Sequence, residues 1–107
     1  MEEPAFSAAS QRRDGRVWVV RVTGELDLAT SPRFQATLDE VLASDPATVL
    51  LGLEGVTFLD STGIRAIVAA RKQLKARGAT LVLDGLSGAV QQVLEVSGLL
   101  DDLTQQV

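Results

Sequence analysis

The feature that most constrains the fold of this chain is an apolar run at positions 17–23. The run reads Val-Trp-Val-Val-Arg-Val-Thr, is nearly all β-branched or aromatic, and ends at Gly24. Apolar residues at both odd and even positions are typical of a strand that is buried on both faces of a sheet. We therefore predict a central strand here. Later apolar runs, at 48–53 continued by 56–59 and at 80–83, predict further strands.

Three helical patterns alternate with these strands. The first begins at Thr30-Ser31-Pro32, where a hydroxyl caps the helix and a proline occupies its first turn. The second follows Asp60-Ser61-Thr62-Gly63 and ends at Gly78, and the third is capped by Ser87. Each has an apolar face at helical spacing, formed by Phe34, Leu38, Val41 and Leu42, by Ile64, Ile67, Val68 and Leu74, and by Val90, Val93 and Leu94.

The element order predicts an α/β fold. A marginal edge strand at 6–10, joined through an Asp14-Gly15 turn, precedes the central strand and gives the order β-β-α-β-α-β-α. The chain of 107 residues has no repeat or linker, so we predict one domain over 1–107. Its sheet should be mixed, mostly parallel and covered by helices. We expect residues 1–5 to be disordered and residues 101–107 either to form a short closing element or to fray.

Composition excludes several classes of function. The chain has no cysteine, histidine or tyrosine, which removes thiolate nucleophiles, His or Cys metal sites and a Ser-His-Asp triad. Its net charge of −4 has the wrong sign for binding a phosphate backbone. The acidic start argues against a signal peptide. No apolar run is long enough to predict a membrane span. We therefore expect a cytoplasmic protein that is not an enzyme and needs neither metal nor cofactor.

The segment Asp60-Ser61-Thr62-Gly63 is the most informative motif. It places two hydroxyls and a carboxylate at the junction between a predicted strand and a predicted helix. The unpaired N–H groups at the start of a helix favour negative charge. A phosphate on Ser61 would lie in that field, with Arg65 one turn further along the same side of the helix. On the residues alone, however, a simple capping role for Ser61 or Thr62 is the favoured interpretation.

Two other interpretations of this region stay open. Asp60 could accept a phosphoryl group with Glu25 and Asp27 holding Mg²⁺, as in response-regulator receiver domains, but the lysines of this chain, Lys72 and Lys75, lie inside a predicted helix. Alternatively, a pocket beside the Asp60 loop could bind a small ligand or nucleotide. The five cations between positions 65 and 77 are expected to face water.

Three spaced segments resemble the STAS domain, and more narrowly a free-standing bacterial anti-sigma factor antagonist. They are residues 19–27, 58–64 and 96–99, and the similarity runs from about Arg16 to Leu100. The resemblance implies that Ser61 is phosphorylated by a serine kinase that is also the anti-sigma factor, with Thr62 as the second choice. It also implies a partner-binding surface formed by Glu25, Asp27, Asp60, Ser61, Thr62, Gly63 and Arg65.

The resemblance further implies a partner switch in transcription, typically in a stress response. The unphosphorylated antagonist binds the anti-sigma factor and frees the sigma factor, the phosphorylated form is inactive, and a phosphoserine phosphatase resets the switch. A physical route exists, because a phosphate adds about −1.5 to −2 charges at a contact surface. The alternative is a STAS-type scaffold or a ligand-binding regulatory module without a phospho-switch. The oligomeric state is left open.

Overall fold

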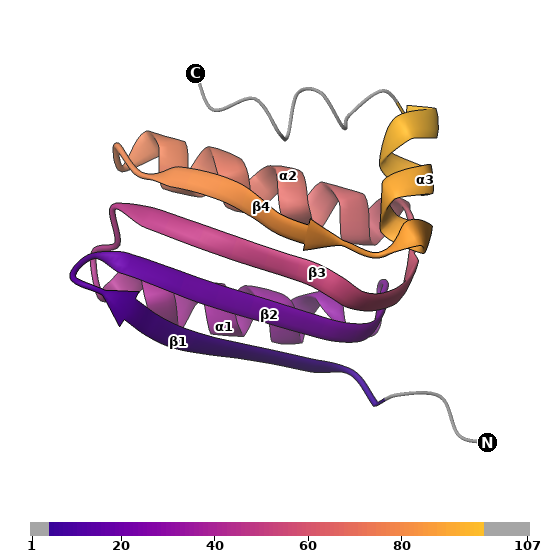
Figure 1. The fold of residues 1–107 in the computed structure, drawn as a ribbon, viewed down its shortest axis with the longest axis horizontal. Coiled ribbons are helices and arrows are strands. Elements are labelled where there is room, and N and C mark those ends of the chain that lie inside the picture. The colour runs from indigo at the N-terminus through magenta and orange to yellow at the C-terminus, as the bar shows by residue number, and fades with distance from the viewer. Residues whose placement is uncertain (1–4, 98–107) are drawn as a thin grey trace.

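The computed structural model describes residues 5–97, which form one four-stranded sheet and three helices (Figure 1). The element order confirms the predicted α/β arrangement. The expectations for residues 1–5 and 101–107 lie outside the described residues, apart from Ala5. The strands are β1 (Ser7–Asp14), β2 (Val17–Leu26), β3 (Thr48–Leu59) and β4 (Thr80–Leu86), and the helices are α1 (Ser31–Ala43), α2 (Ser61–Ala76) and α3 (Gly88–Ser97).

The sheet order is β1-β2-β3-β4, with β1 antiparallel to β2 and the other pairs parallel. Strand β2 is therefore internal, as its sequence predicts. Its adjacent residues Val19 and Val20 point to opposite faces, and both are buried, with 5% and 0% of their surface exposed. Only the face towards α1 and α2 is buried along the strand. On the opposite face Val19 is buried but Arg21 is exposed, so the predicted burial on both faces holds at Val19 and fails at Arg21.

Two strands differ from the predicted limits. Strand β1 continues past residue 10 to Asp14, because Gln11 and Arg12 still pair with β2 before the turn at Gly15. Strand β3 is continuous through Gly52 and also through Gly55, which lies between the two predicted runs 48–53 and 56–59. The side chains of β2 explain these glycines: a Cβ at position 55 would lie 2.7 Å from the Thr23 side chain.

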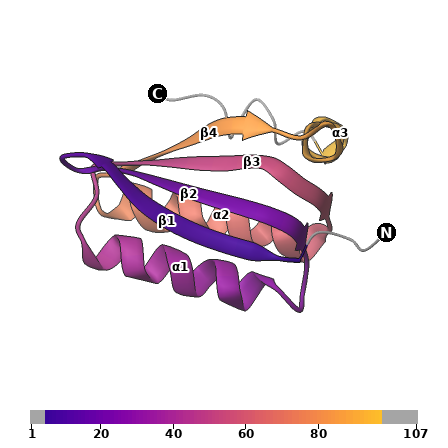
Figure 2. The same cartoon turned by 60° about the horizontal axis from the view of Figure 1, so that its bottom comes forward.

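Helices α1 and α2 cover one face of the sheet (Figure 2). Their apolar residues pack against β2, β3 and β4 in one core that includes Val20, Val22, Leu51, Phe34, Leu38, Ile67 and Leu74. Helix α3 packs against the carboxyl end of β3, and its Val90 and Leu94 are buried. Ser87 caps α3 as predicted, because its Oγ accepts a hydrogen bond of 3.1 Å from the Val90 amide. Within residues 5–97, no helix is long and apolar enough to cross a membrane.

Candidate functional site

The carboxyl ends of β2 and β3 lie side by side and bring the predicted site residues to one edge of the sheet. Leu26 and Leu59, the last residues of these strands, are register partners. Asp27 and Asp60 follow them directly, so the β2–α1 loop and the start of α2 leave the same edge. The fold therefore brings together two segments that are more than thirty positions apart in the sequence.

Gly63 joins these two segments by close packing. A Cβ built at position 63 would collide with the main-chain oxygen of Leu26 and with the side chain of Leu59. Gly63 is buried in the first turn of α2. The motif therefore needs glycine here so that α2 can approach the end of β2.

Asp60 caps α2, which corrects the prediction that Ser61 or Thr62 does so. Asp60 has extended backbone angles, and its Oδ1 accepts a hydrogen bond of 2.9 Å from the Gly63 amide. A carboxylate at this position satisfies a free N–H group and also suits the positive end of the helix. The capping role is thus filled, and Ser61 is left as the first residue of α2 with its side chain exposed, whereas Thr62 is half-buried.

The β2–α1 loop is held by a network around Thr30 and Asp27. Thr30 Oγ1 accepts a hydrogen bond from the Asp27 amide and donates to the Glu25 carbonyl, at 2.9 and 2.7 Å. Asp27 Oδ1 accepts from the amides of Ala29 and Thr30 at 3.0 and 3.1 Å. Thr30 precedes α1 but makes no side-chain cap bond, contrary to the prediction, because its hydroxyl faces this loop. The predicted partner residue Asp27 is thereby a loop-shaping residue as well.

The other two predicted site residues take different positions. Glu25 is in β2, half-buried, and is the register partner of Phe58 in β3. Arg65 is exposed on α2, one turn after Ser61, as predicted. Within residues 5–97 it forms no side-chain hydrogen bond or ion pair, so its guanidinium is available for a phosphate on Ser61 or for a partner.

Two apolar residues at this edge were not predicted as site residues. Leu28, in the β2–α1 loop, has 74% of its surface exposed, and Phe58, near the end of β3, has 46% exposed. Large apolar side chains at the surface often mark contacts with another protein. The sequence carried a signal for Leu28, which is apolar within a loop, but none for Phe58, which lies in an apolar run and therefore reads as core.

The acidic residues of this edge form no metal centre in the described part of the chain. Residues 5–97 contain no group of three carboxylates that could hold a metal ion. Asp60 Oδ1 binds the Gly63 amide, and Asp27 Oδ1 binds its own loop. The receiver-like interpretation, which requires clustered carboxylates around Mg²⁺, gains no support from this geometry.

Comparison with known proteins defines the class. The family model of the STAS domain matches residues 8–106, and the fold just described agrees with it. The chain belongs to the STAS domain family. Within that family it groups with the anti-sigma factor antagonists.

Three relatives support the narrower grouping. An anti-sigma-B factor antagonist of Listeria monocytogenes is 35% identical over 80 residues, which are 75% of this chain and 70% of the relative. The crystal structure of an anti-sigma factor antagonist from Mycobacterium paratuberculosis matches with a TM-score of 0.78 and 25% identity over 92% of this chain and 91% of that one. The structure of the anti-sigma factor antagonist SpoIIAA in its unphosphorylated form matches with a TM-score of 0.72 and 25% identity, over 89% of this chain and 82% of that one.

The family also bears on enzymatic activity. The relatives are named for antagonism of an anti-sigma factor, which is regulation by binding. The prediction of a protein that is not an enzyme is confirmed by this membership.

Proposed function

We propose that this protein is a phosphorylation-switched antagonist that acts in the cytoplasm. Its unphosphorylated form binds an anti-sigma factor, which is also a serine kinase, and thereby frees a sigma factor for transcription. Phosphorylation of Ser61 by that kinase ends the interaction, and a phosphoserine phosphatase restores it. The observation that carries this proposal is the exposed Ser61 hydroxyl at the first position of α2, left free because Asp60 supplies the cap.

The choice of Ser61 over Thr62 follows from exposure and position. A kinase must bring the acceptor oxygen to the γ-phosphate of ATP, so the acceptor side chain has to be accessible. Ser61 is exposed and Thr62 is half-buried. A phosphate on Ser61 would also lie beside the N–H groups of the first turn of α2, which tolerate negative charge, so the helix can keep its structure after modification.

The proposed docking surface surrounds Ser61 and combines apolar and acidic side chains. Leu28 and Phe58 provide exposed apolar area on the same edge, and such side chains are the usual anchors of a protein interface. Glu25, Asp27 and Asp60 give that edge an acidic character. The loop network and the Gly63 packing hold these residues in place before binding, which lowers the entropic cost of association.

This composition supports a switch by charge. A phosphate brings about −1.5 to −2 charges and three strong acceptor oxygens to a surface that already carries three carboxylates. A partner that covers Leu28 and Phe58 would have to remove the phosphate from water without a matching cation. Arg65 alone offsets only part of that charge. Release after phosphorylation is the expected result.

The relatives support the same proposal. SpoIIAA, which this chain resembles at 25% identity, is an anti-sigma factor antagonist whose unphosphorylated form has been distinguished. The Listeria relative antagonises an anti-sigma-B factor. An antagonist role with a phosphorylated and an unphosphorylated state is the function that we transfer to this chain.

The proposal is tested by labelling in a lysate of the source cells. The wild type, Ser61→Ala and Thr62→Val are incubated with lysate and ATP labelled at the γ-phosphate, and the tryptic peptides are mapped. We expect wild type and Thr62→Val to be labelled and Ser61→Ala to stay unlabelled. Equal labelling of all three variants, or loss of label only in Thr62→Val, would contradict Ser61 as the switch.

A further inference from the structure

Arginines gather at the β1–β2 hairpin, at the opposite end of the sheet from Ser61, and one more, Arg21, lies midway along β2. The β1–β2 hairpin and its flanks, residues 5–24, carry four arginines and one acidic residue, Asp14, whereas the whole chain has a net charge of −4. The hairpin turn at Gly15 precedes β2, so it lies at the amino end of the strand whose carboxyl end adjoins the Ser61 site. This cluster is therefore separate from the proposed docking surface.

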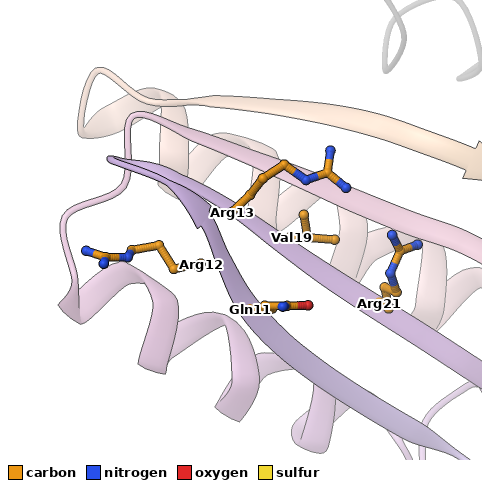
Figure 3. Close-up of a pocket in the computed structure, with 5 residues that line it drawn as sticks. All are labelled: Gln11, Arg12, Arg13, Val19 and Arg21. Atoms are coloured by element: carbon orange, nitrogen blue, oxygen red, sulfur yellow. The ribbon is translucent and has the colours of Figure 1, made fainter.

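The cluster borders a hollow in the sheet. The hollow has a volume of about 270 Å³ and is lined by Gln11, Arg12, Arg13, Val19 and Arg21 (Figure 3). A second hollow of about 120 Å³ shares Gln11, Val19 and Arg21 with it, so the two lie next to each other along β1 and β2. Val20 and Val22 belong to the core beneath α1 and α2, and by alternation Val19 and Arg21 face the other side of the sheet.

An irregularity in β1 separates the two adjacent arginines. The register of β1 against β2 shifts between Arg12 and Asp14, which makes Arg13 an additional residue in the strand. Arg12 pairs with Trp18, whose side chain packs against the core, whereas the Arg13 side chain extends over β2 towards the side of Val19 and Arg21. In Figure 3 the Arg12 side chain points the other way, towards α1. The Arg13 side chain thus reaches over the hollow, whereas the Arg12 side chain turns away from it although Arg12 also borders it.

The Arg21 side chain is held in place beside the hollow. Its Nη1 lies 3.3 Å from Glu54 Oε1, and its stem crosses Gly52, where a Cβ would lie 3.4 Å from Arg21 Cγ. Arg13 forms no side-chain hydrogen bond or ion pair within residues 5–97. Val19 forms an apolar floor between them, only 5% exposed, although it is not part of the main core. The hollow therefore has one guanidinium paired with Glu54, one without an anionic partner within residues 5–97, and an apolar base.

We propose that this hollow binds a small ligand that carries a phosphate group. A guanidinium presents a planar fork of N–H donors that fits phosphate oxygens. Arg13 supplies the positive charge that has no carboxylate partner within residues 5–97, and Arg21, whose charge Glu54 offsets, supplies further N–H donors. The Gln11 amide adds a donor at the same place. The volume is near the lower end for small-molecule pockets, about 300 Å³, and favours a compact anion over a protein segment. The inference does not depend on the phospho-switch, because the two sites share no residue.

The test is a titration of the full chain with inorganic pyrophosphate at constant ionic strength. Binding is monitored through the backbone amide chemical shifts in NMR spectra. We expect saturable shifts at residues 11–13 and 19–21, and the same binding curve for Ser61→Ala. Arg13→Gln should weaken binding roughly tenfold, because a charge-assisted contact is lost. Arg16→Gln removes the same charge from the same hairpin, at a residue that does not line the hollow, and should stay within twofold of wild type.

Three results would overturn this inference. The first is equal weakening by Arg16→Gln and Arg13→Gln, which would mean general attraction to the basic hairpin. The second is the absence of saturable shifts with pyrophosphate. The third is saturation by a polyglutamate peptide with no response to pyrophosphate, which would assign the surface to an acidic protein partner. Thermal melts of both variants verify that the fold is retained, and wild-type binding by Ser61→Ala keeps this test separate from that of the switch.

Discussion

Gly63 lies so close to the main-chain oxygen of Leu26 that any side chain at position 63 would collide with it. This contact fixes the start of α2 against the end of β2. It therefore fixes Ser61 relative to the β2–α1 loop, which contributes Asp27 and Leu28 to the same edge. The glycine of the motif acts on the docking surface through packing, and the serine acts through its hydroxyl.

Replacing Gly63 tests this contact. Gly63→Ala should lower the free energy of unfolding by about 1–3 kcal/mol, because the added methyl group forces α2 away from Leu26. Urea denaturation measures the change. Gly88→Ala is the matched control, since position 88 is also in the first turn of a helix and a Cβ there meets no atom within 4 Å. Equal destabilisation by both substitutions would contradict the packing argument.

The Asp60 cap can be separated from the Asp60 charge. Asp60→Ala removes the acceptor of the Gly63 amide bond and should cost about 1 kcal/mol of stability. Asn is also a good N-cap, so Asp60→Asn should stay close to wild type in a thermal melt. If Asp60→Asn unfolds as easily as Asp60→Ala, the carboxylate stabilises the protein by its charge and not by the cap bond.

Thr30 should contribute to stability through its hydroxyl. Thr30→Val keeps the shape of the side chain but removes the bonds to the Asp27 amide and the Glu25 carbonyl. Leaving those part-buried groups without partners should cost about 1–3 kcal/mol in denaturant unfolding. Thr57→Val, at an exposed position in β3, should change stability by less than about 0.5 kcal/mol. If the Thr30→Val protein is as stable as the Thr57→Val protein, the hydrogen bonds of the Thr30 hydroxyl do not stabilise the fold.

Partner binding should depend on the exposed apolar residues of the edge. Phe58→Ala and Leu28→Ala should each weaken capture of the Ser61 kinase from lysate at least fivefold, because truncating an interface anchor typically costs about 1 kcal/mol or more. Immobilised variants are compared by the kinase activity they retain. Val17→Ala, at the opposite end of β2, is the control and should capture as well as wild type. Unchanged capture by both edge variants would place the partner elsewhere.

The fold was predictable because its strong signals are local. The apolar run at 17–23 predicts an internal strand, and the apolar faces of the three helices predict that each helix packs against the sheet. The N-cap residue of α2 was harder to predict, because Asp60, Ser61 and Thr62 are all good N-caps and only the backbone angles decide among them. The start of β1 carried weak β-propensity in its Ser and Ala residues, so its length is set by pairing with β2.

The site was predictable only in part, for the same reason. Parallel strands place their carboxyl ends together, so the location of Asp27 and Asp60 at the same edge follows from the pairing of β2 with β3. The exposure of Phe58 does not follow, because an apolar residue in an apolar run predicts burial. The hollow beside Arg13 could not be predicted either, because it depends on the register shift in β1, for which the sequence has no recognisable pattern.

The most direct test of the central claim is phosphopeptide mapping of the protein isolated from its own cells, during growth and under stress. Intact mass gives the phosphate content, and fragmentation of the segment 60–65 assigns its position. The account predicts a phosphate on Ser61 whose occupancy differs between the two conditions. Absence of phosphate from this segment in every condition would contradict the switch and leave a constitutive STAS scaffold or ligand-binding module.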